Sequence, residues 1–350
     1  MKLNKLLILL FSFCLIQKER QNSNVKSIYL ENKSSQIKIQ ILPEIGNTIH
    51  QIYYNNQPIL YSPIPPEEYE NSKNLQGIPF LHPWANRLEG DYFYWKNKKH
   101  EIRDQNKKLR RDTKGLPIHG LLLKSKDWKV SKAVNYSDES IYESEFIFNT
   151  PELLEIFPFP HIIEHKIILK NNNIIIYLNI KNTGSSEMPI SSGFHPYFIL
   201  PEGSREKTLL QTNARSYYKT GDDLLPTGEK GNAKEFLPEN KGLNELFVDH
   251  VFNDFYGTSR KAFFLAKFPD KILELEFSRE FDHAVIFLPK DRPVICIEPM
   301  TAPTNAFNLS HKNPNIKLQS IRPGETFEAW YRIGIIAEEF KKNSIQKSEQ

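Results

Sequence analysis

An alternation of apolar and polar residues with a period of two constrains the fold of this chain more than any other feature. Over residues 161–170, the odd-numbered positions from Ile163 to Leu169 fall on one side of an extended chain, and the charged residues fall on the other. Residues 171–173 are three asparagines, which signal a turn, and 174–180 continues as a more apolar run. This order predicts a β-hairpin.

Further short strands are expected where apolar runs are bounded by Pro, Asp or Gly, as at 285–288, 294–297 and 327–333. Helical periodicity is not sustained over three turns, no repeat of fixed period occurs, and no Pro/Gly/Ser-rich linker divides the chain. With 39% apolar residues the chain can bury a sizeable core. We therefore expect one large all-β sandwich domain over residues 25–338 and a frayed polar tail at 339–350.

The N-terminal segment 1–24 has the composition of a leader. Lys2 and Lys5 precede a stretch, 6–16, that is apolar except for one serine. Such a stretch is too short to span a bilayer comfortably and is typical of the apolar part of a secretory signal. The sequence therefore predicts an exported protein, periplasmic or secreted, with no membrane span. The alternatives are a lipid anchor at Cys14 and a cytoplasmic protein.

The net charge of +4 is concentrated in that leader, whose residues sum to +3. A nucleic-acid-binding protein needs a concentrated positive surface, and the only short basic cluster, 107–111, is interpreted as a solvated loop. The chain has two cysteines, Cys14 and Cys296, which excludes a disulfide scaffold and a paired-cysteine zinc motif. Cys296 lies in an apolar run and is interpreted as a small buried hydrophobe.

One motif resembles a metal-binding sequence. His161, Glu164 and His165 match H-x-x-E-H, whose residues must share one face of a helix to bind a metal. Because the segment alternates as a strand, Glu164 is expected on the face opposite both histidines, and we predict no metal site. The chain also lacks a G-x-S-x-G elbow, a Gly-rich phosphate loop and a G-x-G-x-x-G fingerprint. No cofactor is expected.

His195 and Glu298 interrupt aromatic or apolar sequence, and each precedes a proline. The residue before a proline is restricted to extended geometry, so both backbones should be stiff where the chain leaves a strand. Glu298 also shares strand parity with Cys296, and if that face is buried, desolvation raises the carboxyl pKa. One histidine and one glutamate can form a general acid–base pair. The alternative is a buried ion pair that only holds two strands together.

Four further polar residues stand out. Asn86 and Arg87 are framed by an aromatic and an aliphatic residue, His119 precedes a glycine, and Asp249 is isolated in an apolar run. The arginine could be a bidentate clamp or a surface residue covering the aromatic ring, and a histidine before glycine is more often structural. Together with the acid–base pair and many aromatic residues, this set suits a neutral polyhydroxylated ligand, because aromatic faces take the C–H surface of a sugar.

With these motifs in this order, the sequence resembles the aldose 1-epimerase (galactose mutarotase) family. The resemblance covers nearly the whole chain after residue 25, and it rests on the order of six segments rather than on any one of them. The segments are Asn86-Arg87 with Gly90 and Phe93, His119-Gly120, Gly193–Phe198, Val248–Phe252, Ile297–Pro299 and Arg322–Phe327.

The resemblance implies a galactose mutarotase-like β-supersandwich and a cofactor-independent isomerase that interconverts the α and β anomers of a free aldose hexose. His195 would protonate the ring oxygen, and Glu298 would remove the proton from the anomeric hydroxyl. The implied partner is a monosaccharide, and we expect a monomer or weak dimer. The implied substrate-binding residues are Asn86, Arg87, His119 and Asp249.

The resemblance leaves the substrate open. Residues 82–84 and 300–302 are similar to the broad-specificity members rather than the galactose-optimised ones, and the basic cluster 107–111 raises the alternative of a hexose-6-phosphate 1-epimerase. A non-catalytic sugar-binding protein and a polysaccharide-active enzyme can also share this fold. The retained acid–base pair argues against the sugar-binding protein.

Overall fold

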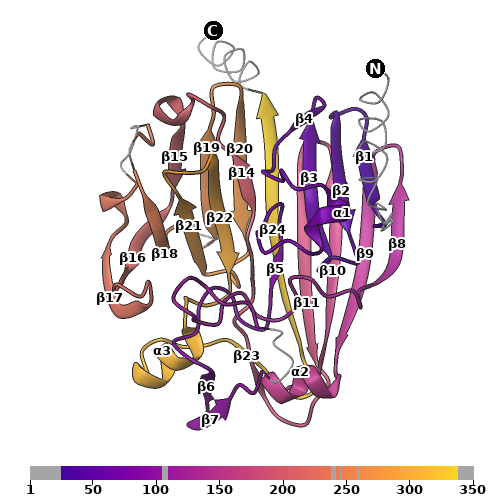
Figure 1. The fold of residues 1–350 in the computed structure, drawn as a ribbon. Helices are drawn as coiled ribbons and strands as arrows, with labels where there is room; N and C mark the ends of the chain where they lie inside the picture. The colour runs from indigo at the N-terminus through magenta and orange to yellow at the C-terminus, as the bar shows by residue number, and fades with distance from the viewer. Residues whose placement is uncertain (1–24, 105–108, 238–241, 245, 258–260, 338–350) are drawn as a thin grey trace, which may run out of the picture.

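The computed structural model describes residues 25–104, 109–237, 242–244, 246–257 and 261–337. Within these residues the chain is mainly antiparallel strand, and two eight-stranded sheets form a single sandwich-type domain (Figure 1). The all-β fold class predicted from the period-two alternation is confirmed.

We call one eight-stranded sheet the long sheet. Its order is β15 (Leu209–Thr212), β19 (Ala262–Lys267), β20 (Lys271–Phe277), β24 (Thr326–Ala337), β11 (Asn173–Asn182), β10 (His161–Lys170), β9 (Glu139–Phe148) and β8 (Lys129–Asn135). We call the other the site sheet. Its order is β17 (Pro226–Asn232), β16 (Ala214–Thr220), β18 (Val248–Phe255), β21 (His283–Leu288), β22 (Val294–Met300), β13 (Gly193–Phe194) and β5 (Phe80–Leu81), with β14 (Tyr197–Ile199) also paired to β22.

Smaller elements surround these two sheets. A four-stranded sheet, which contacts β8 and β9, consists of β1 (Ile28–Asn32), β2 (Ile37–Leu42), β3 (Thr48–Tyr54) and β4 (Gln57–Pro58). Two two-stranded pairs are β6 (Tyr92–Trp95) with β7 (Lys98–Glu101), and β12 (Met188–Pro189) with β23 (Ser320–Ile321). The helices are α1 (Pro66–Tyr69), α2 (Pro151–Ile156) and α3 (Ala306–Lys312), and the 3-10 turns are Arg205–Lys207 and Ala233–Glu235.

The hairpin predicted over residues 161–180 is present as β10 and β11, which pair from His161 opposite Asn182 to Lys170 opposite Asn173. Asn171 lies in the turn with φ +50°, a left-handed conformation that asparagine tolerates better than most residues. His161 and His165 are buried and Glu164 is exposed. The H-x-x-E-H string is therefore a strand, as predicted, and its carboxylate lies on the face opposite the two histidines.

Two hydrophobic clusters pack on opposite faces of the site sheet. The larger cluster fills the space between the two eight-stranded sheets and includes Ile176, Leu275 and Tyr331 from the long sheet and Ile286 and Ile297 from the site sheet. The smaller cluster joins Leu81, Val251, Val285 and Cys296 of the site sheet to Leu75, Ala85 and Leu123, which lie in connecting segments. The site sheet is thus covered by the long sheet on one face and by loops on the other.

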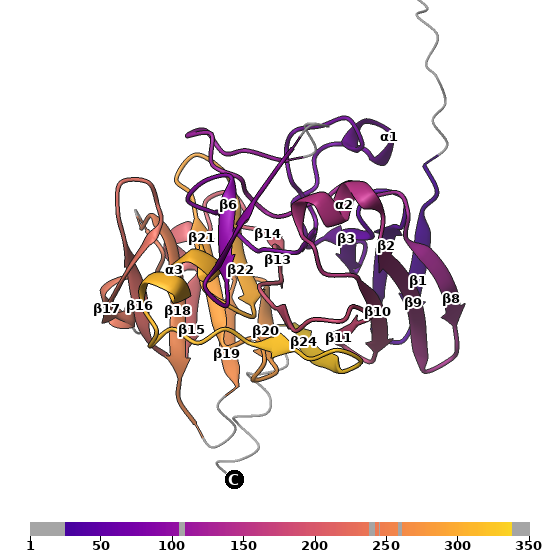
Figure 2. The ribbon, with the colours of Figure 1, turned by 90° about the horizontal axis from the view of Figure 1, so that it is seen from below.

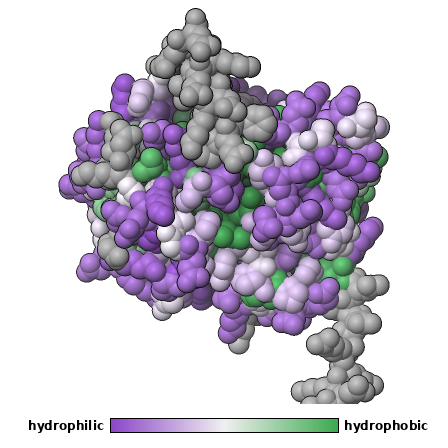
Figure 3. Space-filling model, turned by 90° about the horizontal axis from the view of Figure 1, so that it is seen from above, coloured by the Kyte–Doolittle hydropathy of each residue, from purple (hydrophilic) through white to green (hydrophobic). Residues whose placement is uncertain are grey.

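The figures show the same layering. Seen from below, β21 and β22 lie between β20 and β24 on one side and the segments that carry α1 and β6 on the other (Figure 2). Seen from above, the surface is mainly hydrophilic and shows hydrophobic residues only in small patches (Figure 3). The smaller cluster thus lies beneath loop segments on the outer face of the site sheet.

Several sequence-based expectations lie outside the described residues. These are the leader at 1–24 with Cys14, Lys107 and Lys108 of the basic cluster, and the tail at 339–350. In the described part of the chain, no helix has both the length and the apolar content needed to cross a bilayer.

Candidate active site

Strand register brings His195 and Glu298 together. Both β13 and β14 pair with β22, and Tyr197 of β14 lies opposite Cys296. His195 precedes Tyr197 by two residues and Glu298 follows Cys296 by two, so the antiparallel register places His195 across from Glu298. His195 Nε2 lies 3.3 Å from Glu298 Oε1, and the two side chains are only 7% and 2% exposed.

The expected backbone position is correct for one of these residues and wrong for the other. His195 lies between β13 and β14, where the chain leaves a strand. Glu298 instead lies inside β22, because the strand continues through Pro299, which stays in register with Ala284 of β21. The glutamate is therefore held by strand pairing on both sides rather than at a strand end.

The carboxylate of Glu298 lies on the loop-covered face of the site sheet. The predicted parity with Cys296 is confirmed, since Cys296 belongs to the smaller cluster whereas Ile297 belongs to the inter-sheet core. The same face carries Asp249, because Asp249 of β18 lies opposite Phe287 of β21, and Phe287 lies opposite Cys296. Three adjacent strands thus face one space beneath the loops, with Asp249 on β18, Phe287 on β21 and Glu298 on β22.

That space is a cavity of about 140 Å³. It is well below the ~300–1,000 Å³ of pockets for drug-sized ligands, and its size suits one small molecule. All six residues selected from the sequence line it, and four more residues complete its wall. The lining is Asn86, Arg87, His119, His195, Asp249 and Glu298, with Ile118, Tyr197, Phe287 and Arg292.

Two loop segments place Asn86, Arg87 and His119 over the sheet. Asn86 and His119 both have left-handed backbones, with φ of +59° and +66°, and the His119 N–H donates a 2.9 Å hydrogen bond to the Asn86 carbonyl. A left-handed backbone strains residues other than glycine, and strain of this kind is concentrated at functional sites. Arg87 donates from Nε to Asp112 over 2.8 Å and from a terminal nitrogen to the Asn86 side chain over 3.0 Å. The guanidinium is thereby fixed in one orientation.

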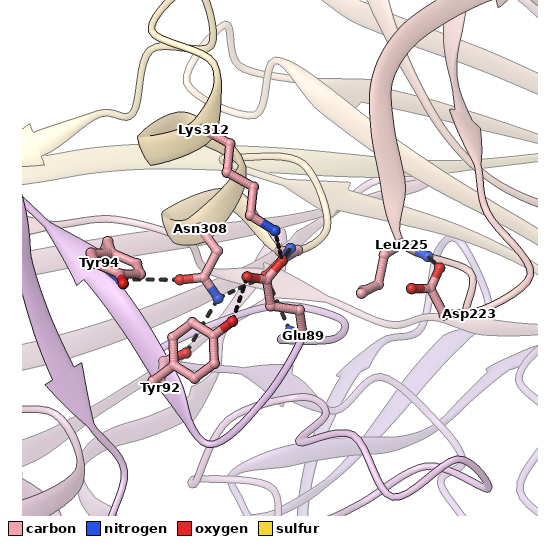
Figure 4. A network of polar contacts seen from close by, with 8 residues as sticks. Glu89, Tyr92, Tyr94, Asp223, Leu225, Asn308 and Lys312 are labelled. Carbon is pink, nitrogen blue, oxygen red and sulfur yellow. Dashed lines mark hydrogen bonds and ion pairs between the residues drawn. The ribbon is translucent and has the colours of Figure 1, made fainter.

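A polar network anchors the Asn86–Arg87 turn to the segment that follows Glu298 (Figure 4). The Glu89 carboxylate accepts hydrogen bonds from Tyr92 at 2.7 Å and from Asn305 at 2.9 Å, and it pairs with Lys312 of α3. The Asn305 N–H also donates to the Arg87 carbonyl over 2.9 Å. The turn that carries Arg87 and the strand that carries Glu298 are therefore joined outside the cavity, which fixes their spacing.

Burial shifts the pKa values of both carboxyl groups of the cavity in the same direction. It raises the pKa of Glu298 well above its usual range, and the negative charge of Asp249 raises that pKa further, against an opposing effect of Arg87. Burial likewise raises the pKa of Asp249, and Arg87 opposes that shift. The expected increase in the Glu298 pKa thus has the predicted direction.

Burial shifts the pKa values of the two cavity histidines in the opposite direction. It lowers the pKa of His195 to about 3, with a further decrease from the positive charge of Arg292. It also lowers the pKa of His119 well below its usual range. An ordinary histidine can act as an acid near neutral pH, whereas here the removal of an imidazolium from water disfavours the protonated form. Both shifts favour the uncharged forms, a carboxylic acid and a neutral imidazole, over the imidazolium–carboxylate pair.

Three polar atoms at this site have no hydrogen-bond partner among the described residues, although they are buried: His195 Nδ1, His119 Nδ1 and Glu298 Oε2. Buried polar atoms in folded proteins are normally paired, so each unpaired atom requires an explanation. A cluster of such atoms around one cavity fits a site built to bind a polar ligand. A purely structural His–Glu pair would gain nothing from leaving these groups unsatisfied.

Four cavity residues were missed from the sequence. Tyr197 stacks on His195 with ring centroids 4.2 Å apart and an interplanar angle of 3°. Its position two residues after His195, on the same face of the chain, was an available signal. Ile118, Phe287 and Arg292 carry no local signal, because an isoleucine, a phenylalanine in an apolar strand and an arginine in a loop are ordinary residues in those settings.

The described arginines of the basic cluster, Arg110 and Arg111, make their side-chain contacts elsewhere, although the charge of Arg110 lowers the pKa values of His119 and His195. Arg111 binds Asp91 through two hydrogen bonds of 2.8 and 3.0 Å, and Arg110 donates to the Lys73 carbonyl. Neither arginine lines the cavity. Among the residues that the structure describes, no group of three His, Cys, Asp or Glu side chains is arranged to hold a metal ion.

Comparison with known proteins identifies relatives of the whole domain. The model of the aldose 1-epimerase family matches residues 26–334. An uncharacterized Escherichia coli K12 protein, YihR, is 22% identical over 241 residues, which are 65% of this chain and 70% of that protein. A second uncharacterized E. coli K12 protein, YphB, is 25% identical over 188 residues, which are 52% of this chain and 56% of that protein.

Solved structures show the same fold. A galactose mutarotase-like protein from Clostridium acetobutylicum superposes with a TM-score of 0.74 at 23% identity, over 87% of this chain and 93% of that one. A GalM/aldose epimerase homologue from C. elegans has a TM-score of 0.70 at 16% identity, over 89% of this chain and 99% of that one. The galactose mutarotase-like architecture expected from the sequence is confirmed.

Proposed function

Because this chain belongs to the aldose 1-epimerase family, we propose that it interconverts the α and β anomers of a free aldose, with His195 and Glu298 as the acid–base pair. The observation that carries this proposal is the 3.3 Å separation of His195 Nε2 and Glu298 Oε1 in a cavity sized for one small ligand. No cofactor is required, since ring opening and closure move only protons.

The reaction needs two proton transfers at neighbouring oxygens of one sugar. The Glu298 carboxylate removes the proton from the anomeric hydroxyl while protonated His195 delivers a proton to the ring oxygen, and the C1–ring oxygen bond breaks to give the open-chain aldehyde. Rotation about C1–C2 exposes the other face of the carbonyl. Ring closure then reverses both transfers, and each positioned group contributes about 10²- to 10⁴-fold to the rate.

One proton serves the whole cycle. The imidazolium–carboxylate form that starts ring opening contains the same single proton as the neutral imidazole–carboxylic acid form favoured by burial. The proton needs to cross only from Glu298 to His195 within the pair. Ring opening leaves the pair as a neutral imidazole and a carboxylic acid, which is the form that burial favours. Ring closure regenerates the imidazolium and the carboxylate. Shared occupancy of one proton thus reconciles the low pKa of His195 with its role as the acid.

The remaining residues orient the sugar. We assign Arg87 and His119, which the loops hold over the cavity, as donors to the sugar hydroxyls, and the Asp249 carboxylate as an acceptor. Asn86 orients the Arg87 guanidinium through its side-chain oxygen. A fixed guanidinium loses little conformational entropy on binding, which favours positioning of the substrate.

A polarimetric assay tests this proposal. Freshly dissolved α-glucose, α-galactose and other aldoses are followed as their rotation decays, against the spontaneous rate and against a His195→Gln, Glu298→Gln double variant of this protein. We expect acceleration by the unmodified protein only. No acceleration with any aldose, sugar phosphate or sugar acid would refute the proposal, and saturable binding without exchange would identify a sugar-binding protein instead.

A further inference from the structure

The two arginines of the cavity differ in what they contact. Arg87 is neutralised by Asp112 at 2.8 Å and bound by the Asn86 side chain. The guanidinium of the half-buried Arg292 lies 5.2 Å from the centre of the Phe287 ring, and among the described residues it has neither an ion-pair partner nor a side-chain hydrogen bond. A partly desolvated guanidinium with five unused donors is a site for a ligand acceptor.

Arg292 lies near His195. The positive charge of Arg292 lowers the pKa values of His195 and Tyr197, while the charge of Arg87 acts on His195 as well as on Asp249 and Glu298. Phe287 links Arg292 to the imidazole, since its ring also makes an edge contact with His195 at 6.4 Å between centroids. Through Phe287, Arg292 therefore borders the part of the cavity that His195 lines.

The covalent structure of the sugar determines which of its groups would lie beside Arg292. In a hexopyranose the exocyclic carbon C6 is attached to C5, which is bonded to the ring oxygen. If His195 serves the ring oxygen, as the proposed function requires, the C6 substituent extends along the His195 side. The anomeric hydroxyl then faces Glu298, and the substituent at C6 comes within reach of the free guanidinium.

We propose that Arg292 determines substrate specificity by binding a carboxylate at C6, so that the preferred substrate is an aldohexuronic acid. A planar guanidinium pairs with a carboxylate through two parallel hydrogen bonds. One unpaired positive charge matches the single charge of a carboxylate, whereas a dianionic phosphate would need a second free cation in the lining; Arg87 is already paired with Asp112, and Arg110, whose charge also acts on His195, does not line the cavity. The small cavity volume also favours the smaller group.

The test compares kcat/KM for anomer exchange, measured by magnetisation-transfer NMR, on glucose, glucuronate and glucose 6-phosphate. We expect glucuronate to exceed both others, and Arg292→Gln to lower the glucuronate-to-glucose ratio by about 10- to 100-fold, the usual value of a lost charge-assisted pair. We compare the glucuronate-to-glucose ratio rather than single rates, because removal of this charge also changes the pKa of His195, which acts on every substrate. Arg292→Lys should recover part of the ratio through charge alone.

Arg279→Gln, which removes a 79% exposed arginine that does not line the cavity, is the matched control and should leave the ratio unchanged. A higher kcat/KM for glucose or glucose 6-phosphate than for glucuronate overturns the inference, as does a preference for glucuronate that survives in Arg292→Gln. Because the inference rests on the proposed function, glucuronate binding is also measured by calorimetry. If no sugar is anomerised, the proposed function fails. Weaker binding of glucuronate to Arg292→Gln than to the unmodified protein then still supports the carboxylate site at Arg292. Equal binding to the two proteins overturns it.

Discussion

Two groups of buried histidines in this protein have similar burial but different surroundings. In the cavity, His195 faces Glu298, and atoms of both residues have no hydrogen-bond partner among the described residues. In the core, His82 and His161 form a chain: His161 Nδ1 lies 2.6 Å from the Phe159 carbonyl, the two Nε2 atoms are 2.7 Å apart, and His82 Nδ1 lies 2.8 Å from the Ser192 hydroxyl.

The core chain has one consistent assignment of its protons. The Phe159 carbonyl requires a proton on His161 Nδ1, so in neutral His161 the Nε2 atom accepts. His82 Nε2 therefore donates, and its Nδ1 accepts from Ser192. Every ring nitrogen is satisfied with both imidazoles neutral, which agrees with the low pKa values that burial gives them.

The comparison shows that burial alone does not mark a functional histidine. Burial lowers the pKa of His161 to about 4 and that of His195 to about 3, so the direction of the shift does not separate the two groups. What separates them is a carboxyl partner with a raised pKa, unpaired polar atoms and a cavity. The following predictions test this distinction.

The largest effect is expected at the acid–base pair. Glu298→Gln and His195→Gln keep the approximate size of each side chain but remove proton transfer, so each should lower kcat at least ~100-fold. Polarimetry at saturating substrate measures this loss, and circular dichroism checks that the variants fold. A variant close to the unmodified rate would mean that the catalytic roles are misassigned.

The pH dependence of kcat/KM should show a broad plateau. The active pair holds one proton; it gains a second as pH falls through the lowered pKa of His195 and loses its only one as pH rises through the raised pKa of Glu298. The acid limb should therefore lie well below the ordinary histidine value of ~6.5, and the alkaline limb well above the ordinary glutamate value of ~4.3. Activity lost between pH 7 and 6 would contradict this assignment.

Asp112→Asn should mainly weaken substrate binding. Its carboxylate fixes Arg87 from outside the cavity, and both side chains are largely buried. Loss of the charged partner frees the guanidinium, and we expect KM to rise by about tenfold, as for one charge-assisted hydrogen bond, with little change in kcat. An equal fall in kcat with unchanged KM would place Arg87 in the chemical step.

His161→Leu should act on stability and leave catalysis intact. It leaves the buried His82 Nε2 donor unpaired, which costs about 1–3 kcal/mol of unfolding free energy. Urea unfolding measures the difference, and kcat of the folded variant should match that of the unmodified protein. His311→Leu, at an exposed histidine stacked on Tyr94, is the control and should change stability by under ~0.5 kcal/mol. A selective loss of kcat in His161→Leu would make this histidine functional.

The smallest expected effect is a gain in thermal stability of the inactive Glu298→Gln variant. Because the Glu298 pKa is raised in the folded state, this carboxyl contributes stability below its unfolded pKa that is lost as pH rises through the folded value. Glu298→Gln removes that dependence, so the inactive variant should melt at a higher temperature, and the gain should be larger at pH 8 than at pH 5. Calorimetry at both pH values checks this, and an equal gain at the two pH values would contradict it.

Much of the site could be predicted because its residues break local patterns. Glu298 and Asp249 are polar residues in apolar strands, His195 interrupts an aromatic segment, and Arg87 and His119 lie in segments that resemble a known family in order. All of these line one cavity. By contrast, Arg292 is an ordinary loop arginine in the sequence, and only the cavity shows that it faces the site.

The period-two alternation determined the all-β class, the β10–β11 hairpin and the exposed position of Glu164, because these depend on neighbours in the chain. Only the tertiary structure decided which face of the site sheet carries Glu298, which charge state of the buried pair is favoured, and which cavity arginine is left without an ion-pair partner. Parity states that two side chains share a face but not what covers that face. Desolvation and ion pairing depend on residues such as Asp112 and Asp249 that long-range strand and loop packing brings together.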